Sequence, residues 1–470
     1  MEALDIHAPL IIYYIAPFFT SLGSIALPRL TDPLPASPEA LLSDLYRVAT
    51  AAVKPGPALA ERLRSVDSRA AGPWIIALGK AALPMALAAL DVLAERGTEP
   101  AGGLVVPPAR APSPHPALAL VPGDHPEPGP GSLEAARALA GVAAAAAGAG
   151  QEVWVLLSGG TTSLLGAPVE GIAPDDLTRL YALLLGSGLD ITAMNRIRKR
   201  FSRWGAGRLA LALAPARVRV YVVSDVIGDD LAAIGSGPCV PDPTTAAEVR
   251  DLLQRSGLWE KIPDSARRQV REAEAGRMAE TPKPGDQAFE RVTLELIASN
   301  GLALEAAAKR AAELGLDPVV SATPLAGEAA AAGASVAATL LQDYARRDIP
   351  QPERKRCFIW GGETTVTLGA GGGLGGRCQE LALAAAGALT GGPPGIALLA
   401  AGTDGRDGPT DAAGAIVDGR TWAAVSAAGR DPARDLAGHD AYRALDAAGA
   451  LLRPGLTGTN VMDVVIGLCL

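Results

Sequence analysis

The amino-acid sequence predicts an α/β protein of two α/β domains, because strand-like and helix-like segments alternate along most of the chain. The strand-like segments are continuous apolar runs, as is typical of parallel strands covered by helices on both faces. A stretch rich in charge, proline and glycine at 277–290 interrupts this alternation, which then resumes. We therefore expect a Rossmann-like three-layer parallel sheet in 37–276, a linker at 277–290 and a second α/β domain at 291–470.

The individual elements follow from their hydrophobic periods and their flanking residues. In the first domain we expect strands at 73–79, 102–107, 117–123, 152–159 and 218–226, and helices at 37–53, 80–97, 132–149 and 173–188. In the second domain we expect strands at 292–299, 317–323, 357–368, 396–405 and 460–468, and helices at 301–315 and 327–347. Two such domains leave a cleft between them, and ligands of open α/β sheets bind beyond the carboxyl ends of the strands.

The composition excludes several classes of protein. Of 470 residues, 49% are hydrophobic and 20% are charged, which is typical of a globular chain with a sizeable core. The formal net charge of -8 does not favour a nucleic-acid partner. Four widely spaced cysteines and four histidines form neither a disulfide framework nor a zinc or paired-histidine motif. This usage suits a reducing compartment, and we expect a cytoplasmic protein.

The first 36 residues contain an uncharged run of membrane-spanning length, but their start is acidic and Pro17 interrupts the run. Three interpretations remain open for residues 1–36: an extension outside the native fold, a membrane anchor, or a packed element. We expect the extension, and no membrane partner.

Two strand-end turns in the first domain can hold an anion. Lys80 follows a strand at the start of a helix, where a cation does not stabilise the helix itself. The turn after 152–159 offers amides and hydroxyls from Ser158, Gly159, Gly160 and Thr161, which can cradle a phosphate. A lysine at a sheet edge and an ordinary strand–helix turn are the alternatives. His125, in GDHPEP, either touches substrate or bonds to the backbone.

Two acidic clusters follow later strands, and each can bind Mg²⁺ or supply a general base. The first includes Asp225 and Asp229, and the second includes Thr403, Asp404 and Asp407. Some of these aspartates are instead expected to serve as turn and cap residues. The terminal TGTNVMD, at 457–463, ends in Asn460 and Asp463, which are either polar ligands or part of a turn.

The segment 361–380 is nearly half glycine and carries one basic side chain, Arg377. It begins with Gly361, Gly362 and Glu363 and lies between a strand-like and a helix-like segment, an arrangement that presents backbone N–H groups to an anion. A guanidinium binds carboxylate or phosphate with two parallel hydrogen bonds. A second basic cluster, NRIRKR at 195–200, is either part of this chemistry or a solvated helix face. Together these groups indicate phosphoryl transfer to a small acidic substrate.

The motifs GKAALPMA, LLSGGTTSLL, NRIRKRFSRWGAGRLA, SDVIGDDLAAIGSGPCVPDPTT, GGETTVTLGAGGGLGGRCQELALA, AAGTDGRDGPTDAAGA and LTGTNVMD occur in this order. Over residues 38–468 the chain resembles the class II glycerate 2-kinases, whose C-terminal part is called the MOFRL domain, here at about 356–465. The resemblance implies ATP-dependent phosphorylation of D-glycerate at its 2-hydroxyl to give 2-phosphoglycerate, with Mg²⁺ or another divalent cation and with the active site between the domains. It places the catalytic lysine on Lys80 and the catalytic arginine on Arg377.

The resemblance leaves the aspartates' roles open among Asp225, Asp229, Asp404 and Asp407. We predict Asp225 as catalytic, and Asp229, Asp404 and Asp407 as metal ligands. We predict nucleotide contacts at the residues Ser158, Gly159, Gly160, Thr161, Gly361, Gly362, Glu363, Thr403 and Asn460. The expected partners are D-glycerate and ATP, and a homodimer is left open.

The chain departs from the family pattern at Cys378 and Met462, where asparagine is usual, and at Arg200, where histidine is usual. These changes bear on substrate preference and rate. Hydroxypyruvate reductase ranks second, because the first strand–helix turn, ALGKAALP, lacks the GxGxxG of a dinucleotide site. A module that only binds a small acid or phosphate ranks third.

Overall fold

The structure is a computed structural model that describes residues 37–66, 72–346, 355–369 and 372–470. The expected extension at 1–36 lies outside the described residues, as do residues 370 and 371 of the glycine-rich segment. Across the described ranges, none of the helices is long and apolar enough to cross a membrane.

Six strands form the first sheet, in the order β3-β2-β1-β4-β5-β6, and every neighbouring pair is parallel. They are β1 Trp74–Leu78, β2 Gly102–Val106, β3 Leu118–Leu120, β4 Val153–Leu157, β5 Val218–Val223 and β6 Val292–Ala298. The predicted parallel sheet is therefore confirmed. Its strand order is that of dinucleotide-binding α/β folds, in which the winding reverses between β1 and β4.

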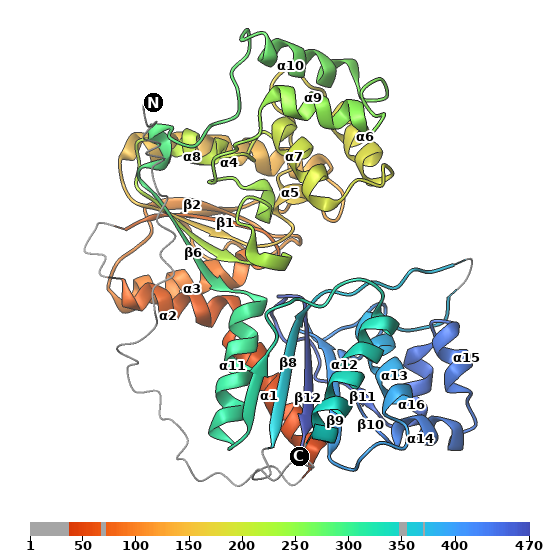
Figure 1. The fold of residues 1–470 in the computed structure, drawn as a ribbon. Coiled ribbons are helices and arrows are strands. Elements are labelled where there is room, and N and C mark those ends of the chain that lie inside the picture. Colours follow the sequence, from red (N-terminus) through yellow and green to blue (C-terminus); the bar gives the residue numbers. More distant parts are fainter. Residues whose placement is uncertain (1–36, 67–71, 347–354, 370–371) are drawn as a thin grey trace, which may run out of the picture. The chain divides into compact units, whose positions relative to one another are not determined.

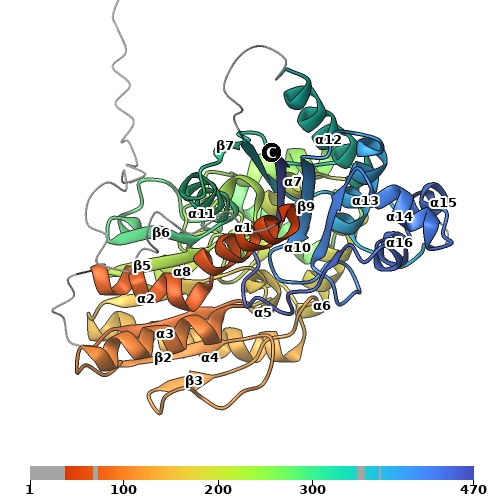
Figure 2. The ribbon, with the colours of Figure 1, turned by 90° about the horizontal axis from the view of Figure 1, so that it is seen from below.

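Helices cover both faces of this sheet, because successive side chains of each strand point to opposite faces. Ile75 and Ala77 pack in one core with α1 Pro38–Ala52, α2 Pro55–Ser65 and α3 Ala82–Glu95. Ile76 and Leu78 pack in another core with α4 Pro130–Ala149 and α8 Arg208–Leu213. Figure 1 shows α4 and α8 on one face and α2 and α3 on the other, and Figure 2 shows α2 and α3 side by side.

A separate helical cluster interrupts the first α/β unit. It consists of α6 Pro174–Leu185, α7 Ile191–Phe201, α9 Ala246–Arg255 and α10 Asp264–Glu274, which share one apolar core. Three short elements connect it to the sheet: α5 Thr161–Leu164, η1 Ile227–Asp229 and η2 Ile234–Ser236. A further short element, η3 Gln287–Phe289, precedes β6.

The second sheet is mixed, in the order β11-β10-β9-β12-β8-β7. Its strands are β7 Asp317–Val320, β8 Arg356–Gly362, β9 Ile396–Gly402, β10 Gly414–Asp418, β11 Leu451–Leu452 and β12 Asp463–Cys469. Only β7 and β8 are parallel, and the chain's last strand, β12, lies antiparallel between β8 and β9. One face packs in a core with α12 Ala329–Ala345, α13 Arg377–Leu389, α14 Thr421–Ala427, α15 Pro432–Ala437 and α16 Ala441–Ala447.

The sheet topology corrects two expectations about which segments belong together. The segment 292–299 was predicted to form the first strand of the second domain. This assignment is wrong, because the segment forms β6, which pairs with β5 in the first sheet. The first helix, α1, contacts β9, β12 and α11 Asn300–Glu313, on the other face of the second sheet. Tyr46 of α1 donates its hydroxyl to the Gly402 carbonyl at 2.7 Å. The domain boundaries themselves stay a prediction.

Candidate functional site

The first group of predicted site residues lies where the winding of the first sheet reverses. Lys80 follows β1, the turn 158–160 follows β4, and Asp225 follows β5. The carboxyl ends of parallel strands lie at one edge of a sheet, and ligands bind there at the reversal point. The fold therefore brings these residues to the position where an α/β sheet most often binds a ligand.

Hydrogen bonds join the two turns on either side of this point. The Lys80 N–H donates to the Gly159 carbonyl at 2.9 Å, and the Ala81 N–H donates to Ser158 Oγ at 3.0 Å. Ser158 Oγ also bonds the Leu78 carbonyl at 3.2 Å. Ser158 is buried by these contacts, whereas the Lys80 side chain is exposed. The serine thus fixes the turn that presents the lysine.

The glycines of the turn allow charged side chains to approach the backbone closely. A Cβ on Gly159 would lie 1.9 Å from Asp225 Oδ2, a separation that no side chain tolerates. Gly160 has a left-handed φ of 83°, and a Cβ there would lie 3.2 Å from both His125 Cδ2 and Lys80 Cγ. Lys80, His125 and Asp225 therefore surround one glycine turn, and His125, for which the sequence left substrate contact open, lies at this site.

Burial shifts the ionisation of two groups in this cluster. Desolvation raises the pKa of the Asp225 carboxyl, and the charges of Lys80 and His125 offset part of that rise. Desolvation and the nearby Lys80 charge lower the pKa of His125. Asp225 is therefore a stronger base than an ordinary aspartate, and His125 is favoured in its neutral form.

The predicted metal ligands do not form a common site made of protein side chains alone. Within the described residues, no group of three His, Cys, Asp or Glu side chains could hold a metal ion. Asp229, in η1 after β5, differs from the other two because its Oδ1 atom is buried without a hydrogen-bond partner. An uncompensated buried carboxylate oxygen is costly and fits a cation ligand. Asp229 thus remains suited to the predicted metal role.

The second group of site residues centres on Arg377, the first residue of α13. Its Nε lies 2.6 Å and its terminal nitrogen 2.9 Å from the two carboxylate oxygens of Asp463. Its other terminal nitrogen lies 2.8 Å from Glu363 Oε1. Two carboxylates thus hold the guanidinium, which stays 35% exposed.

The charges of the two groups act on one another. Desolvation raises the pKa of the Glu363 carboxyl and Arg377 lowers it, while Asp463 and Asp225 raise it further and Lys80 lowers it. Interactions between charges weaken with distance and with screening by salt. Glu363, which is bound to Arg377, therefore lies within reach of the charges of Asp225 and Lys80 on the first sheet.

Asp407 is one of the aspartates that serve as cap residues. Its carboxylate accepts hydrogen bonds from the N–H groups of Cys378 at 3.2 Å and Gln379 at 2.8 Å, at the start of α13. Burial raises the pKa of Asp407 to about 7. Asp407 caps the helix that carries Arg377, and this use of both oxygens argues against its predicted metal role. Asp404 accepts the Arg406 N–H at 3.0 Å, as in a turn.

Several predicted nucleotide contacts also have structural explanations. The buried Thr403 hydroxyl donates to the Met462 carbonyl at 2.7 Å and accepts the Val461 N–H at 2.8 Å. A Cβ on Gly361 would lie 1.7 Å from Asn300 Oδ1, and one on Gly362 would lie 2.3 Å from the Leu325 carbonyl. These residues pack the second sheet, so their contacts do not support nucleotide binding.

The remaining predicted contacts behave differently. Thr161 is buried and donates its hydroxyl to the Ser158 carbonyl at 2.8 Å, which closes the turn. Asn460 is exposed, and its Oδ1 accepts the Met462 N–H at 3.2 Å. Its side chain therefore stays accessible to a ligand.

The pair Glu380–His439 was not among the predicted site residues, and Asp463 was named only as either a polar ligand or part of a turn. Asp463 begins the central strand β12 and pairs with Gly362 and Gly402, which places it beside Arg377. Glu380 Oε2 lies 2.9 Å from His439 Nδ1, near the start of α13. Arg377 and Asp463 are 86 residues apart in the sequence, and Glu380 and His439 are 59 residues apart.

The three departures from the family pattern lie in different surroundings. Arg200 is nearly buried and its guanidinium lies 2.7 Å from Glu280 Oε2. Burial raises the pKa of the Cys378 thiol, and the charge of Asp463 raises it further. Met462 has a left-handed φ of 69°, a conformation in which asparagine is better tolerated.

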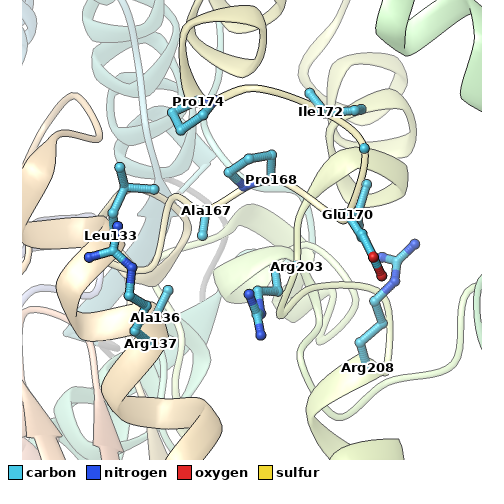
Figure 3. A pocket seen from close by; sticks show the side chains of 12 residues that line it. Leu133, Ala136, Arg137, Ala167, Pro168, Glu170, Ile172, Pro174, Arg203 and Arg208 are labelled. Atoms are coloured by element: carbon cyan, nitrogen blue, oxygen red, sulfur yellow. The ribbon is translucent and has the colours of Figure 1, made fainter.

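A pocket of about 650 Å³ lies apart from these residues (Figure 3). Residues of helix α4 and of the segment 167–174 line it together with Arg203 and Arg208, and its basic groups are Arg137, Arg203 and Arg208. None of the predicted site residues contributes to this pocket. Arg208 donates to the carbonyls of Lys199 and Ser202 at 2.9 and 3.0 Å, so it serves mainly to hold the end of α7.

Comparisons with known proteins agree with this architecture. Residues 41–271 match the model of a domain of unknown function named DUF4147, and residues 356–463 match the MOFRL family. A glycerate 2-kinase of Pyrococcus horikoshii is 38% identical over 84% of this chain and 87% of its own length. The crystal structure of a glycerate kinase from Thermotoga maritima superimposes with a TM-score of 0.81 at 35% identity, covering 93% of this chain and all of that chain.

Two of the similar proteins bear the name of a different enzyme. A protein of Agrobacterium vitis that is named a hydroxypyruvate reductase is 37% identical over 83% of this chain and 85% of its own length. Both family models nevertheless match in the order and at the positions that the motifs predict. The chain therefore belongs to the glycerate 2-kinase family that carries a C-terminal MOFRL domain.

Proposed function

We propose that this protein transfers the γ-phosphoryl group of ATP to the 2-hydroxyl of D-glycerate and releases 2-phosphoglycerate and ADP. One observation carries the proposal. Lys80 stands at the reversal point of the first sheet, and its charge reaches Glu363, the carboxylate bound to Arg377. The ammonium of Lys80, the guanidinium of Arg377 and the carboxylate of Asp225 thus all act on Glu363. This arrangement of charges suits a substrate with two anionic groups. The names of the relatives support the same reaction.

The chemistry needs positioning and charge neutralisation more than a special nucleophile. Asp225 takes the proton of the 2-hydroxyl as the new O–P bond forms and the bond between the γ-phosphorus and its bridging oxygen breaks. Its raised pKa suits this role, because a more basic carboxylate accepts the proton more readily. Lys80 and Arg377 share the neutralisation of the substrate carboxylate and the transferred phosphoryl group.

The turn 158–160 contributes fixed dipoles on the Lys80 side of the reaction. Ser158 and Gly159 bond to the Lys80 turn, so backbone amides and the ammonium are held in one arrangement before substrate binds. Groups arranged in advance lose little energy to reorganisation during the reaction. This arrangement supports a phosphate-binding role for the turn.

The residues of the β5 loop fit a divalent cation. Mg²⁺ in phosphoryl-transfer sites is usually held by one or two carboxylates together with substrate phosphates, so a three-carboxylate cage is not required. The unpartnered, buried Oδ1 of Asp229 is the atom best suited to hold it. When bound, the ion would neutralise phosphate charge.

The decisive assay supplies ATP, Mg²⁺ and D-glycerate and measures ADP and the phosphorylated acid. A parallel reaction supplies NADH and hydroxypyruvate, because two relatives bear the name of that reductase. Kinase activity with no NADH oxidation is expected. NADH oxidation without ADP release would overturn the proposal, and binding without either reaction would favour a non-catalytic module.

Two variants test the roles of the basic groups. Lys80→Ala and Arg377→Ala should each lower kcat by at least roughly a hundredfold, as expected for groups that stabilise transition-state charge. Circular dichroism and the melting temperature check that each variant is folded. Near wild-type turnover in either variant would remove that residue from the mechanism.

A further inference from the structure

His125 lies beside the glycine turn of the candidate site, and its ring nitrogens bond to none of the described residues. The sequence left two roles open for it, a contact to substrate or a hydrogen bond to the backbone. No such backbone bond exists within the described ranges, and the side chain is exposed. The imidazole is therefore available to a ligand that enters the site.

His115, another loop histidine of the first domain, shows the structural alternative. Its Nδ1 accepts the Ala117 N–H at 3.1 Å, and its Nε2 lies 2.7 Å from Glu99 Oε2. Both ring nitrogens of His115 are thus occupied by the protein. The contrast separates a histidine that holds its own loop together from one that does not.

The loop that carries His125 is nevertheless fixed in place. The Asp124 N–H donates to Ser132 Oγ at 3.0 Å, and Asp124 Oδ2 accepts the Ser132 N–H at 3.2 Å, in the first turn of α4. A Cβ on Gly123 would lie 2.3 Å from the Leu164 carbonyl of α5, so the loop also rests closely on the helical turn that follows residues 158–160. The position of His125 is therefore set by the residues around it and not by its own ring.

The ring is aimed at the turn that we propose to bind phosphate. A Cβ on Gly160 would lie 3.3 Å from His125 Nε2 and 3.2 Å from Lys80 Cγ. The Nε2 edge of the imidazole thus faces the turn beside the lysine. Asp225 approaches the preceding residue, Gly159, and its charge and that of Lys80 both act on the imidazole. The three side chains converge on two consecutive glycines.

We propose that His125 is a further catalytic residue, whose Nε2–H donates a hydrogen bond to a non-bridging oxygen of the phosphoryl group during its transfer. The identity of the reaction rests on the proposed function. The phosphoryl group is the acceptor because Nε2 faces the turn whose amides and hydroxyls suit a phosphate. A neutral imidazole donates from one ring nitrogen, and no bond to a described residue prevents Nε2 from carrying the proton.

The role of His125 in the step is that of a donor only. The 2-hydroxyl oxygen bonds to the γ-phosphorus, the bond from phosphorus to the bridging oxygen breaks, and Asp225 takes the hydroxyl proton. His125 keeps its own proton throughout. Its hydrogen bond strengthens as negative charge gathers on the phosphoryl oxygens, so it acts mainly in the transition state.

The kinetic test compares His125→Leu and His125→Gln with the control His115→Leu. Leucine removes the donor, whereas the glutamine amide places an N–H close to the position of Nε2. His125→Leu should lower kcat at least tenfold with the KM for D-glycerate within about threefold, and His125→Gln should stay within about threefold of the wild-type kcat. His115→Leu should melt at a lower temperature and keep kcat within about twofold, because only structural contacts are lost. Equal losses of kcat in both His125 variants would contradict a donor role.

A second measurement does not depend on turnover. The chain has four histidines, so the ring signals of the ¹³C-histidine-labelled protein can be assigned in NMR spectra with the same variants. Inorganic phosphate and ATP, added separately, should each shift the His125 signal and leave that of His115 in place, whereas D-glycerate alone should shift neither. The proposal fails if neither phosphate probe moves the His125 signal, if D-glycerate alone moves it, or if His125→Leu keeps kcat within twofold. A phosphate-induced shift in a protein without kinase activity would instead retain the phosphate contact and refute the proposed function.

Discussion

Replacing Asp463 by asparagine tests whether Arg377 works only when it is held in place. Asp463 accepts two hydrogen bonds from the guanidinium, at 2.6 and 2.9 Å, and its own side chain is only 7% exposed. Asparagine presents one acceptor and turns an amide N–H toward the guanidinium, so at least one bond is lost. Arg377 then keeps its charge but loses the contact that fixes its direction.

The size of the effect follows from the exposure of the two partners. Removing one partner of a fully buried pair costs about 3–5 kcal/mol of folding stability, and exposed pairs are worth less than about 1 kcal/mol. Arg377 is 35% exposed, so we expect a loss of about 2 kcal/mol. A misdirected catalytic group lowers kcat by about ten- to a hundredfold, equivalent to about 1.4–2.7 kcal/mol of transition-state stabilisation.

The chain offers a matched control. Asp435 binds Arg430 with two bonds, at 2.7 and 2.8 Å, and Arg430 also has a second carboxylate partner, Asp440. Asp435→Asn should lose similar stability in urea unfolding, with kcat within twofold of the wild type. The reasoning is refuted if both variants lower kcat equally, or if Asp463→Asn loses stability and leaves kcat unchanged.

Three further predictions concern other contacts. Gly159→Ala should displace Asp225 and lower kcat at least tenfold, whereas Gly141→Ala, where a Cβ meets nothing within 4 Å, should leave kcat unchanged; steady-state kinetics would show both. The wild-type unfolding free energy should fall from about pH 4 to about pH 7. Burial raises the pKa of Asp407 to about 7, so over this range the unfolded chain has lost a proton that the folded protein keeps. Urea unfolding of Asp407→Asn at several pH values should show a weaker fall. Tyr46→Phe should lower stability by about 1 kcal/mol, because the hydroxyl's bond to the Gly402 carbonyl is lost while the Gly405 N–H still donates to that carbonyl; thermal melts would show this, with no change in KM.

Much of the local structure could be predicted from residue patterns. The apolar runs at 73–79 and 152–159 became β1 and β4, since strands buried on both faces need apolar side chains on both faces. Ser37 caps α1 by accepting the Ala40 N–H at 3.2 Å, as its position before a proline and an acid indicated. Lys80 and the turn 158–160 could also be predicted from local sequence, because each lies in a short turn directly after an apolar strand.

The partners of these residues could not be read from the sequence, because contacts between distant segments depend on strand order. The charge, proline and glycine content of 277–290 favoured a domain boundary before the next strand. That strand, β6, nevertheless joins the first sheet, because tertiary packing decides which strand forms hydrogen bonds with β5. Asp407 was expected to bind metal, and it caps α13 because the second sheet brings the 403–411 turn against that helix.

The sequence by itself determined the α/β class, the parallel first sheet, the turns that carry Lys80 and Arg377, and the family, because hydrophobic period and turn chemistry are local properties. Tertiary structure alone decided that Asp463 and Glu363 hold Arg377 and that Asp225 faces Gly159. These facts depend on burial and on distances between strands far apart in the chain. Burial also sets the charge state of each group, which is why the ionisation of Asp225 and Asp407 could be assigned only from the fold.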